Sequence, residues 1–153
     1  MALEHAVVYR NEDSYCGPIS KLVMLPDEEL LVVFREARWR GEVTHADPTT
    51  RMCLLRSRDR GQSWFSQITP DPTGGNGCAI MRLSDGTLLA NAYHWLFAPM
   101  AQRETLSQRP RQRTQEWFGM ASAGGGVFMT RSETDGYTWD SPRHIPEPEE
   151  WPD

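Results

Sequence analysis

One stretch of this sequence occurs twice, and the duplication limits the folds that the chain can adopt. Leu25–Leu31 (LPDEELL) matches Leu83–Leu89 (LSDGTLL) at an offset of 58 residues. Apolar runs flank both copies, so each copy predicts two short strands joined by a tight turn. Asp85-Gly86 favours such a turn because glycine adopts a positive φ without steric cost. The sequence therefore predicts an all-β chain assembled from repeated units.

A second pair of matching segments completes the repeated unit. Ser57–Trp64 (SRDRGQSW) and Ser132–Trp139 (SETDGYTW) are separated by 75 residues, and each follows an apolar run. The larger offset places 17 extra residues between the second and third strands of the second unit. We expect this region, roughly His94–Gly126, to be a long loop with at most one helical turn near Ala98–Leu106. Each unit then has four antiparallel strands, which is the content of one β-propeller blade.

The first of these two segments fits the Asp-box pattern S-x-D-x-G-x-[ST]-W at every specified position. In such a turn the Ser and Asp side chains bond backbone groups, the glycine takes the strained position and the Trp ring packs under the strands. The second copy is degenerate, because Thr134 stands in the aspartate slot and Asp135 is displaced by one. The predicted structural residues are Ser57, Asp59, Gly61 and Trp64 in the first copy, and Ser132, Asp135, Gly136 and Trp139 in the second. We interpret them as structural residues, since such a turn indicates a fold and does not indicate which reaction, if any, the protein catalyses.

The order of features in the first unit resembles the opening blade of exo-sialidases, in the sialidase (neuraminidase) superfamily of BNR or Asp-box repeat proteins. Leu25–Leu31 corresponds to the L-P-D-G-x-L-L hairpin of that family, and Phe34–Arg38 to its A-E-G-R element. Asp47 precedes Arg56 at a spacing similar to that of the family's general acid. The resemblance implies about two blades of a six-bladed propeller, in a partial propeller domain over residues 1–153, with blade one at about 14–70 and blade two at about 74–145.

The resemblance also implies a sialidase-like glycoside hydrolase, an exo-glycosidase acting on glycans, or the amino-terminal portion of one. Asp47 would be its general acid, the ligand or substrate would be a carbohydrate, and no cofactor or metal is expected. One position departs from the family, because Cys16 stands where the first arginine of the carboxylate-binding triad is expected. The family's nucleophile and remaining arginines fall in later blades. The alternative is a non-catalytic Asp-box propeller that binds glycans or serves as a scaffold.

Strand order brings the candidate site residues to one end of the units, opposite the turns. Glu36, Arg38, Asn76 and His94 are the predicted substrate-binding residues, and Asp47 lies in the loop that follows Arg38. Each has a structural alternative. Asp47 would cap a turn before proline, Arg38 would be a surface arginine, Glu36 would form a salt bridge and His94 would end a strand. Trp39, Trp95 and Trp117 lie in or near loops of the same end, where they would stack on sugar rings or pack the loops down.

Charge and composition exclude several other classes. The net charge of -5 argues against a nucleic-acid partner, and no apolar run is long enough for a membrane helix. Met1–Tyr9 lacks the pattern of a signal peptide, and three scattered cysteines favour a reducing compartment, so a cytoplasmic location is expected. Because two blades cannot close a propeller, the chain is expected to be either a fragment or a unit of a homo-oligomer that completes the ring.

Overall fold

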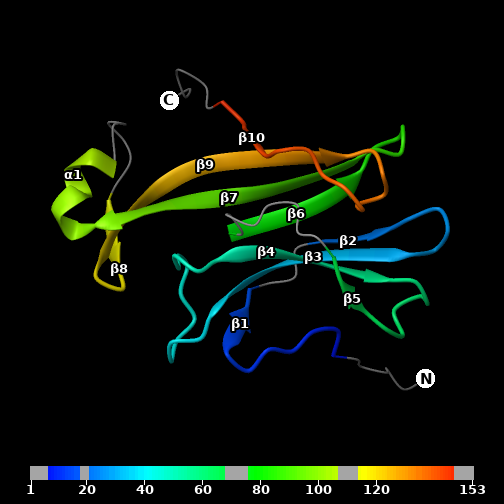
Figure 1. Ribbon diagram of the computed structural model, residues 1–153, viewed down its shortest axis with the longest axis horizontal. Coiled ribbons are helices and arrows are strands. Elements are labelled where there is room, and N and C mark those ends of the chain that lie inside the picture. Colours follow the sequence, from blue (N-terminus) through cyan, green and yellow to red (C-terminus); the bar gives the residue numbers. More distant parts are fainter. Residues whose placement is uncertain (1–6, 18–20, 68–75, 107–113, 147–153) are drawn as a thin grey trace, which may run out of the picture.

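The computed structural model describes residues 7–17, 21–67, 76–106 and 114–146, and most of them lie in two antiparallel β-sheets (Figure 1). The first sheet consists of β1 (Ser14–Cys16), β2 (Lys21–Met24), β3 (Leu30–Arg38), β4 (Arg51–Ser57) and β5 (Phe65–Ser66). The second sheet consists of β6 (Asn76–Arg82), β7 (Leu88–Pro99), β8 (Gln115–Trp117), β9 (Met120–Ser132) and β10 (Arg143–His144). A 3-10 turn, η1 (Met100–Gln102), and a short helix, α1 (Arg103–Leu106), follow β7. The prediction of a mainly β chain is confirmed.

Both sheets are meanders in which strands adjacent in sequence pair side by side. In the first sheet the order is β1-β3-β4-β5, and β2 continues the edge begun by β1, because both strands pair with β3. In the second sheet the order is β10-β9-β7-β6, and β8 pairs with the start of β9 on the edge that it shares with β10. Each sheet is therefore four strands wide, as the duplicated sequence predicts.

The two sheets pack face to face through the alternate residues that point inward from their strands. In this article the inner face of each sheet is the one that touches the other sheet, and the outer face points away. The shared core contains Val23, Leu31, Val33, Met52 and Leu54 from the first sheet, and Cys78, Ile80, Leu88, Ala90 and Ala92 from the second. Removal of this apolar surface from water is the main force that holds the sheets together. A smaller cluster on the outer face of the first sheet comprises Val32, Phe34 and Leu55, covered by Tyr9, Cys53 and Trp64.

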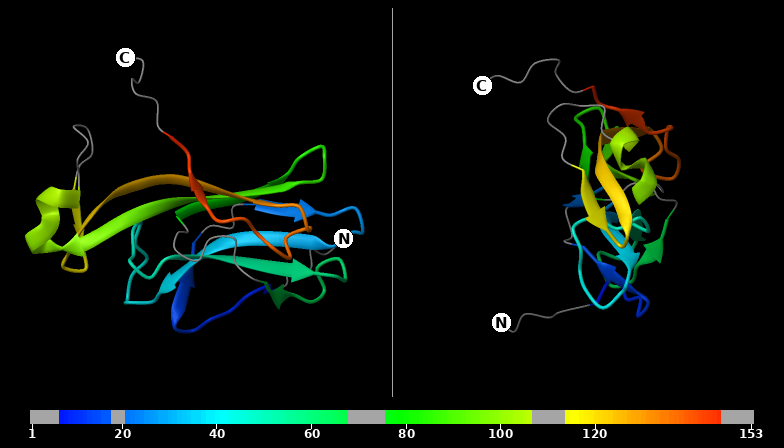
Figure 2. Two further views of the ribbon diagram at one scale, coloured as in Figure 1. Left: turned by 45° about the horizontal axis from the view of Figure 1, so that its top comes forward. Right: turned by 90° about the vertical axis from the view of Figure 1, so that its left-hand side faces the viewer.

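The β-turns gather at one end of the sheets, and the β3–β4 loop lies at the other (Figure 2). The β2–β3 and β6–β7 turns have the same geometry. Glu28 N donates to the Leu25 carbonyl and Gly86 N to the Leu83 carbonyl, each at 3.0 Å. The donating residue has a positive φ in both turns, 66° for Glu28 and 93° for Gly86. The first turn thus places a glutamate where the second has the glycine that the sequence analysis emphasised.

The expectation of a long loop between the second and third strands of the second unit is wrong in part. β7 and β9 remain paired as far as Pro99 and Met120, so much of the predicted loop is an extension of the hairpin. A register shift between His94 and Trp95 marks where the extension begins. Pairing prevails because each strand supplies hydrogen-bond partners to the other, and Ala121 and Ala123 are fully buried there. The helical turn that the sequence allows near Ala98–Leu106, without predicting it, is present as η1 and α1 at the tip of this hairpin.

Both Asp-box turns have the same hydrogen-bond pattern, although their sequences differ. Ser57 Oγ accepts from Gly61 N at 2.7 Å, and Ser132 Oγ accepts from Gly136 N at 2.9 Å. The indole of Trp64 donates to the Gly61 carbonyl and that of Trp139 to the Gly136 carbonyl, both at 3.1 Å. The two turns are therefore one structural device used twice.

The degenerate turn replaces the aspartate by a threonine hydroxyl. Ser63 N donates to Asp59 Oδ1 at 2.8 Å, and Thr138 N donates to Thr134 Oγ1 at 2.9 Å. Asp135 does not take the structural role expected for its side chain, because it occupies the positive-φ position of the turn, at 49°. Its main-chain carbonyl instead accepts a hydrogen bond from Arg56 of the first sheet.

We expect alanine at either turn serine to destabilise the protein by a similar amount. Ser57 and Ser132 are both buried, and each replacement leaves a glycine N–H in the turn without its acceptor. A lost buried hydrogen bond of this kind costs about 1–3 kcal/mol. Urea unfolding of Ser57→Ala and Ser132→Ala measures both costs. A loss at Ser57 with none at Ser132 would show that the degenerate copy is not an equivalent turn.

Candidate functional site

A shallow polar groove lies at the end of the first sheet that is opposite the turns. Its volume is about 270 Å³, and it is formed by Asp13, Ser14, Glu36, Ala37, Arg38, Thr49 and Arg51. Glu36 and Arg38 lie at the C-terminal end of β3. Thr49 comes from the β3–β4 loop and Arg51 from the start of β4. Two predicted binding residues, Glu36 and Arg38, are thus brought together in one groove.

Glu36 is the most heavily hydrogen-bonded side chain of the groove. It accepts from Tyr9 Oη at 2.6 Å, Ser14 Oγ at 2.7 Å and Asn11 Nδ2 at 2.8 Å. Arg51 donates to its other oxygen through Nε at 2.8 Å and Nη2 at 2.5 Å. Burial by itself would raise the pKa of Glu36, but these donors outweigh burial and lower the pKa to about 2. Glu36 therefore carries a fixed negative charge that ties the amino-terminal segment to the sheet, and it bonds Arg51 rather than Arg38.

The same carboxylate holds a neighbouring thiol in its neutral form. Cys53 Sγ lies 3.5 Å from Glu36 Oε2. Burial, followed by the negative charge of Glu36, raises the pKa of the Cys53 thiol to about 12. Cys16 is an exposed residue. Partial burial of its thiol is the larger cause, and the charge of Glu36 the smaller, of a raised pKa there as well. Neither thiol has the electropositive surroundings of a nucleophilic cysteine.

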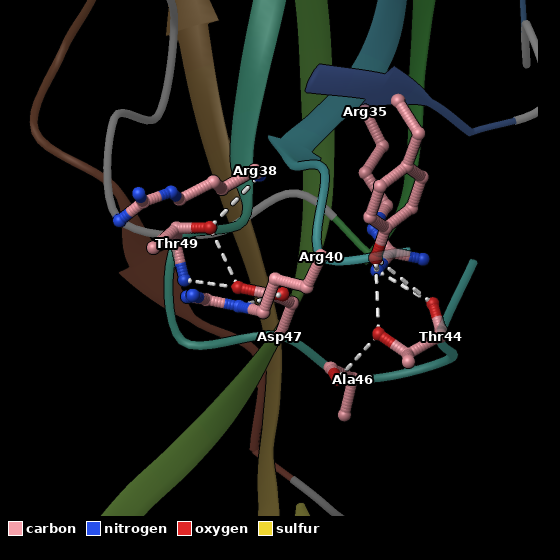
Figure 3. A network of polar contacts seen from close by, with 8 residues as sticks. Arg35, Arg38, Arg40, Thr44, Ala46, Asp47 and Thr49 are labelled. Carbon is pink, nitrogen blue, oxygen red and sulfur yellow. Dashed lines mark hydrogen bonds and ion pairs between the residues drawn. The ribbon is translucent and has the colours of Figure 1, made fainter. Parts of the chain in front are cut away.

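Asp47 is held inside the β3–β4 loop, as Figure 3 shows. Thr49 donates to its Oδ1 through the main-chain N at 2.8 Å and through Oγ1 at 2.6 Å, and Arg40 Nε donates to Oδ2 at 3.2 Å. The Asp47 side chain has 0% exposure. The structure therefore gives Asp47 the turn-capping role, and it does not line the groove.

Thr49 joins this buried carboxylate to the groove. Its hydroxyl, which donates to Asp47, accepts a hydrogen bond from Arg38 N at 3.0 Å (Figure 3). Arg40 is also shared, because its guanidinium carbon lies 4.9 Å from the ring centre of Phe118, between β8 and β9. The loop that bears Asp47 is thereby fastened both to β3 and to the second sheet.

Sequence reasoning missed Arg35, which is buried with an exposure of 5%. Its Nη2 donates to Tyr15 Oη at 2.7 Å and to the Thr44 carbonyl at 2.8 Å (Figure 3). Its Nε has no acceptor, and among the residues that the structure describes no carboxylate lies within ion-pair distance of it. Strand alternation was the available signal, because Arg35 falls on the same face of β3 as Leu31 and Val33.

The remaining predicted residues lie away from the groove. Asn76 is buried at the start of β6, opposite Tyr93 of β7. His94 stacks on Phe128 with ring centres 4.0 Å apart, which supports its alternative role as a packed strand residue. Trp95 packs edge-on against His45 from the loop, at 5.7 Å. Neither Asn76 nor His94 is among the residues that line the groove.

Of the three tryptophans considered, Trp39 is the most exposed. It directly follows Arg38, its side chain is 47% exposed, and it contacts Tyr15 edge-on at 6.4 Å. Trp117 is half-buried on β8, and its indole donates to Gln115 Oε1 at 3.1 Å. Trp39 therefore packs with Tyr15 on the opposite face of the sheet from Arg38, and it is not among the residues that line the groove.

Within the described ranges, no three His, Cys, Asp or Glu side chains come together as a metal-ligand set. In the same part of the chain, no helix has the length and apolar character needed to cross a membrane.

Comparison with known proteins shows that the fold of this chain is similar to that of a solved structure. No family model matches the sequence, and no curated protein matches it. A solved protein of unknown function from Dyadobacter fermentans DSM 18053 is similar in structure, with a TM-score of 0.71 and 22% sequence identity. The match covers 94% of this chain and 40% of that chain, so this chain spans well under half the length of the similar structure.

Proposed function

We propose that this chain forms two adjacent blades of a sialidase-like Asp-box β-propeller. Two four-stranded meanders, packed face to face with matching turns at one end, support this architecture. The two Asp-box turns support it further, because they share one hydrogen-bond pattern despite different sequences. A propeller of this kind carries its ligand site at one end of the blades, which is where the polar groove lies.

Binding of a carbohydrate in the groove is the function that the geometry favours. The observation that carries this proposal is the groove itself, in which the exposed side chain of Arg38 lies together with Asp13 and Thr49. Charged and hydroxyl side chains such as these bond the hydroxyl groups of sugars. Arg38 is exposed, so its donors are available to a ligand, whereas Glu36 and Arg51 are bonded to each other.

Glycoside hydrolysis is the second candidate, with Asp47 as its general acid. It is favoured by the Thr49 hydroxyl, which connects the Asp47 carboxylate to the strand end that bears Arg38. A general acid must reach the glycosidic oxygen within hydrogen-bond distance. Asp47 is fully buried, so hydrolysis requires the β3–β4 loop to open and release Arg40 from the carboxylate.

Glycan binding is tested with the Arg38→Ala variant. We expect it to bind its best glycan at least ~10-fold more weakly than the wild type, because a charged hydrogen bond is worth about 1.5–3 kcal/mol. Titration calorimetry with a panel of mono- and oligosaccharides measures the change. Arg58→Ala, an exposed arginine at the turn end, is the matched control and keeps wild-type affinity. A wild-type chain that binds no member of the panel would contradict the proposal.

The hydrolase candidate is tested separately, by measuring the turnover of glycosides by the wild type and by an Asp47 variant. Fluorogenic glycosides report turnover, and Asp47→Asn removes the acid while keeping the shape of the side chain. Turnover that Asp47→Asn abolishes, with sugar binding intact, would favour the hydrolase. Binding without turnover in the wild type would favour a glycan-binding protein.

A further inference from the structure

The inner face of one sheet and the outer face of the other are built from equivalent residues. The 58-residue offset relates Val23, Leu31 and Val33 of the first sheet to Met81, Leu89 and Asn91 of the second. The former three lie on the inner face of the first sheet. The latter three lie on the outer face of the second sheet, because they alternate with the core residues Ile80, Leu88 and Ala90.

The relation also holds in the opposite direction. The core residues Ile80, Ala90 and Ala92 of the second sheet correspond to Leu22, Val32 and Phe34. Val32 and Phe34 belong to the outer face of the first sheet, and Leu22 pairs with Val32 on that face. The contact between the sheets thus joins two different kinds of face. In the part of the chain that the structure describes, one face of each kind has no further sheet packed on it.

Both of these faces expose apolar side chains. On the second sheet Met81 is 54% exposed, and a cavity of about 500 Å³ lies over the same face, lined in part by Leu89, Met129 and Arg131. On the first sheet Leu22 is 53% and Met24 is 65% exposed, near the turn end. Tyr9 covers Phe34 at the other end of that face, with ring centres 4.9 Å apart. The open apolar area of the first sheet is therefore centred on Leu22 and Met24.

Two equivalent arginines differ in whether a following sheet covers them. Arg56 is buried, and it donates to the Asp135 carbonyl in the second sheet's Asp-box turn and to Glu29. The 75-residue offset relates it to Arg131, which reaches Thr87 at 3.3 Å and is 47% exposed. A further sheet packed on the second one would give Arg131 the acceptor that Arg56 already has.

We infer that the outer face of the second sheet binds the outer face of the first sheet in another copy of this chain. Arg131 of one copy then donates to the carbonyl of Arg60 in the other, because Arg60 is the equivalent of Asp135 and has the same positive φ, at 59°. The contact is head-to-tail, so it leaves a free face at each end and closes only as a ring. The inference rests on the equivalence of the faces and is independent of sugar binding.

Two variants that each disable one face test this arrangement. Leu22→Glu with Met24→Glu places charges on the outer face of the first sheet, and Met81→Glu places one on the outer face of the second. All three residues are more than half exposed, so the fold tolerates the changes, and circular dichroism checks this. Sedimentation velocity at the highest soluble concentration measures the mass of each chain and of their equimolar mixture against the 17.5 kDa monomer.

The head-to-tail contact has a distinctive outcome in this experiment. The wild type exceeds the monomer mass, each variant alone remains monomeric, and the mixture forms a dimer and nothing larger, because it holds a single usable pair of faces. Val43→Glu, which is 68% exposed in the β3–β4 loop, is the control and assembles as the wild type does. A monomeric wild type would overturn the inference. So would either variant forming a dimer by itself, since that requires a symmetric contact.

Discussion

Replacing Arg56 by alanine is expected to lower the free energy of unfolding by about 3–5 kcal/mol, as removal of one partner from a buried ion pair does. Arg56 is fully buried between the sheets, and its guanidinium lies 4.0 Å from the ring centre of Tyr137. It also bonds Glu29 and the Asp135 carbonyl. The variant therefore loses the charge pair, the contact across the sheets and the packing of the stem together. Urea unfolding monitored by tryptophan fluorescence measures the loss.

The duplicated sequence provides the control for this experiment. Arg131→Ala removes the equivalent arginine, which is half-exposed and pairs with Glu133 on the surface. At protein concentrations where the chain is monomeric, its cost should be below about 1 kcal/mol, the usual range for an exposed ion pair. Arg56→Met separates charge from volume, because it keeps the stem and loses the guanidinium. Equal losses for Arg56→Ala and Arg131→Ala would show that burial between the sheets does not determine the effect.

The stability of the protein should fall steeply on acidification, and Glu36 should account for much of the fall. Its pKa is about 2 in the folded chain, against an ordinary value of 4.5. Because the folded pKa is the lower one, the contribution is complete above about pH 4.5 and is lost as the pH falls toward 2. A shift of this size corresponds to roughly 3 kcal/mol. Urea unfolding of the wild type at pH values from 2.5 to 7 measures this dependence.

Glu36→Gln isolates the contribution of this one carboxylate. The amide cannot accept hydrogen bonds from Tyr9, Ser14 and Arg51 as the carboxylate does, so the variant is less stable at pH 7 by roughly 3 kcal/mol. It should equal the wild type near pH 2, where the carboxylate of the wild type is protonating. Asp59, whose pKa its hydrogen bonds to Ser63 lower to about 2, titrates in both proteins and cancels in the comparison. A constant difference between the two proteins at all pH values would contradict this account.

The repeated segments made the β-sheets predictable, because each encodes a local hairpin or turn. Leu83–Leu89 forms the expected turn with Gly86 at positive φ, and the meander order follows from strands adjacent in sequence. The extended β7–β9 hairpin was not predictable, because its outer part lacks a second copy for comparison. There β8 pairs with β9, and η1 and α1 connect the hairpin to the residues before β8. No local sequence pattern indicates that pairing.

Of the candidate site residues, sequence reasoning placed Glu36 and Arg38 at the same end of the sheet, but it did not identify their hydrogen-bond partners. Glu36 and Arg38 share a groove at the expected end of the sheets. The partners of Glu36 lie as far as 27 residues away in sequence, so no local pattern identifies Tyr9 as a donor. Asp47 has the spacing of a general acid in the resembling family, yet its burial depends on how Arg40 and Thr49 close the loop. Spacing locates a side chain along the chain, and it does not determine whether solvent reaches it.

The position of Arg56 also matters while the chain is being synthesised. The first sheet ends at Ser66, but Asp135, which covers the arginine, follows Arg56 by 79 residues. At a translation rate of about 5–20 residues per second, the turn that covers Arg56 is synthesised roughly 4–16 seconds after Arg56 itself. Arg56 lies on the same face of the sheet as Leu31, Val33 and Leu54, so a charged side chain interrupts this apolar surface during that interval. The nascent sheet is thus less prone to aggregate, and the same side chain later joins the two sheets.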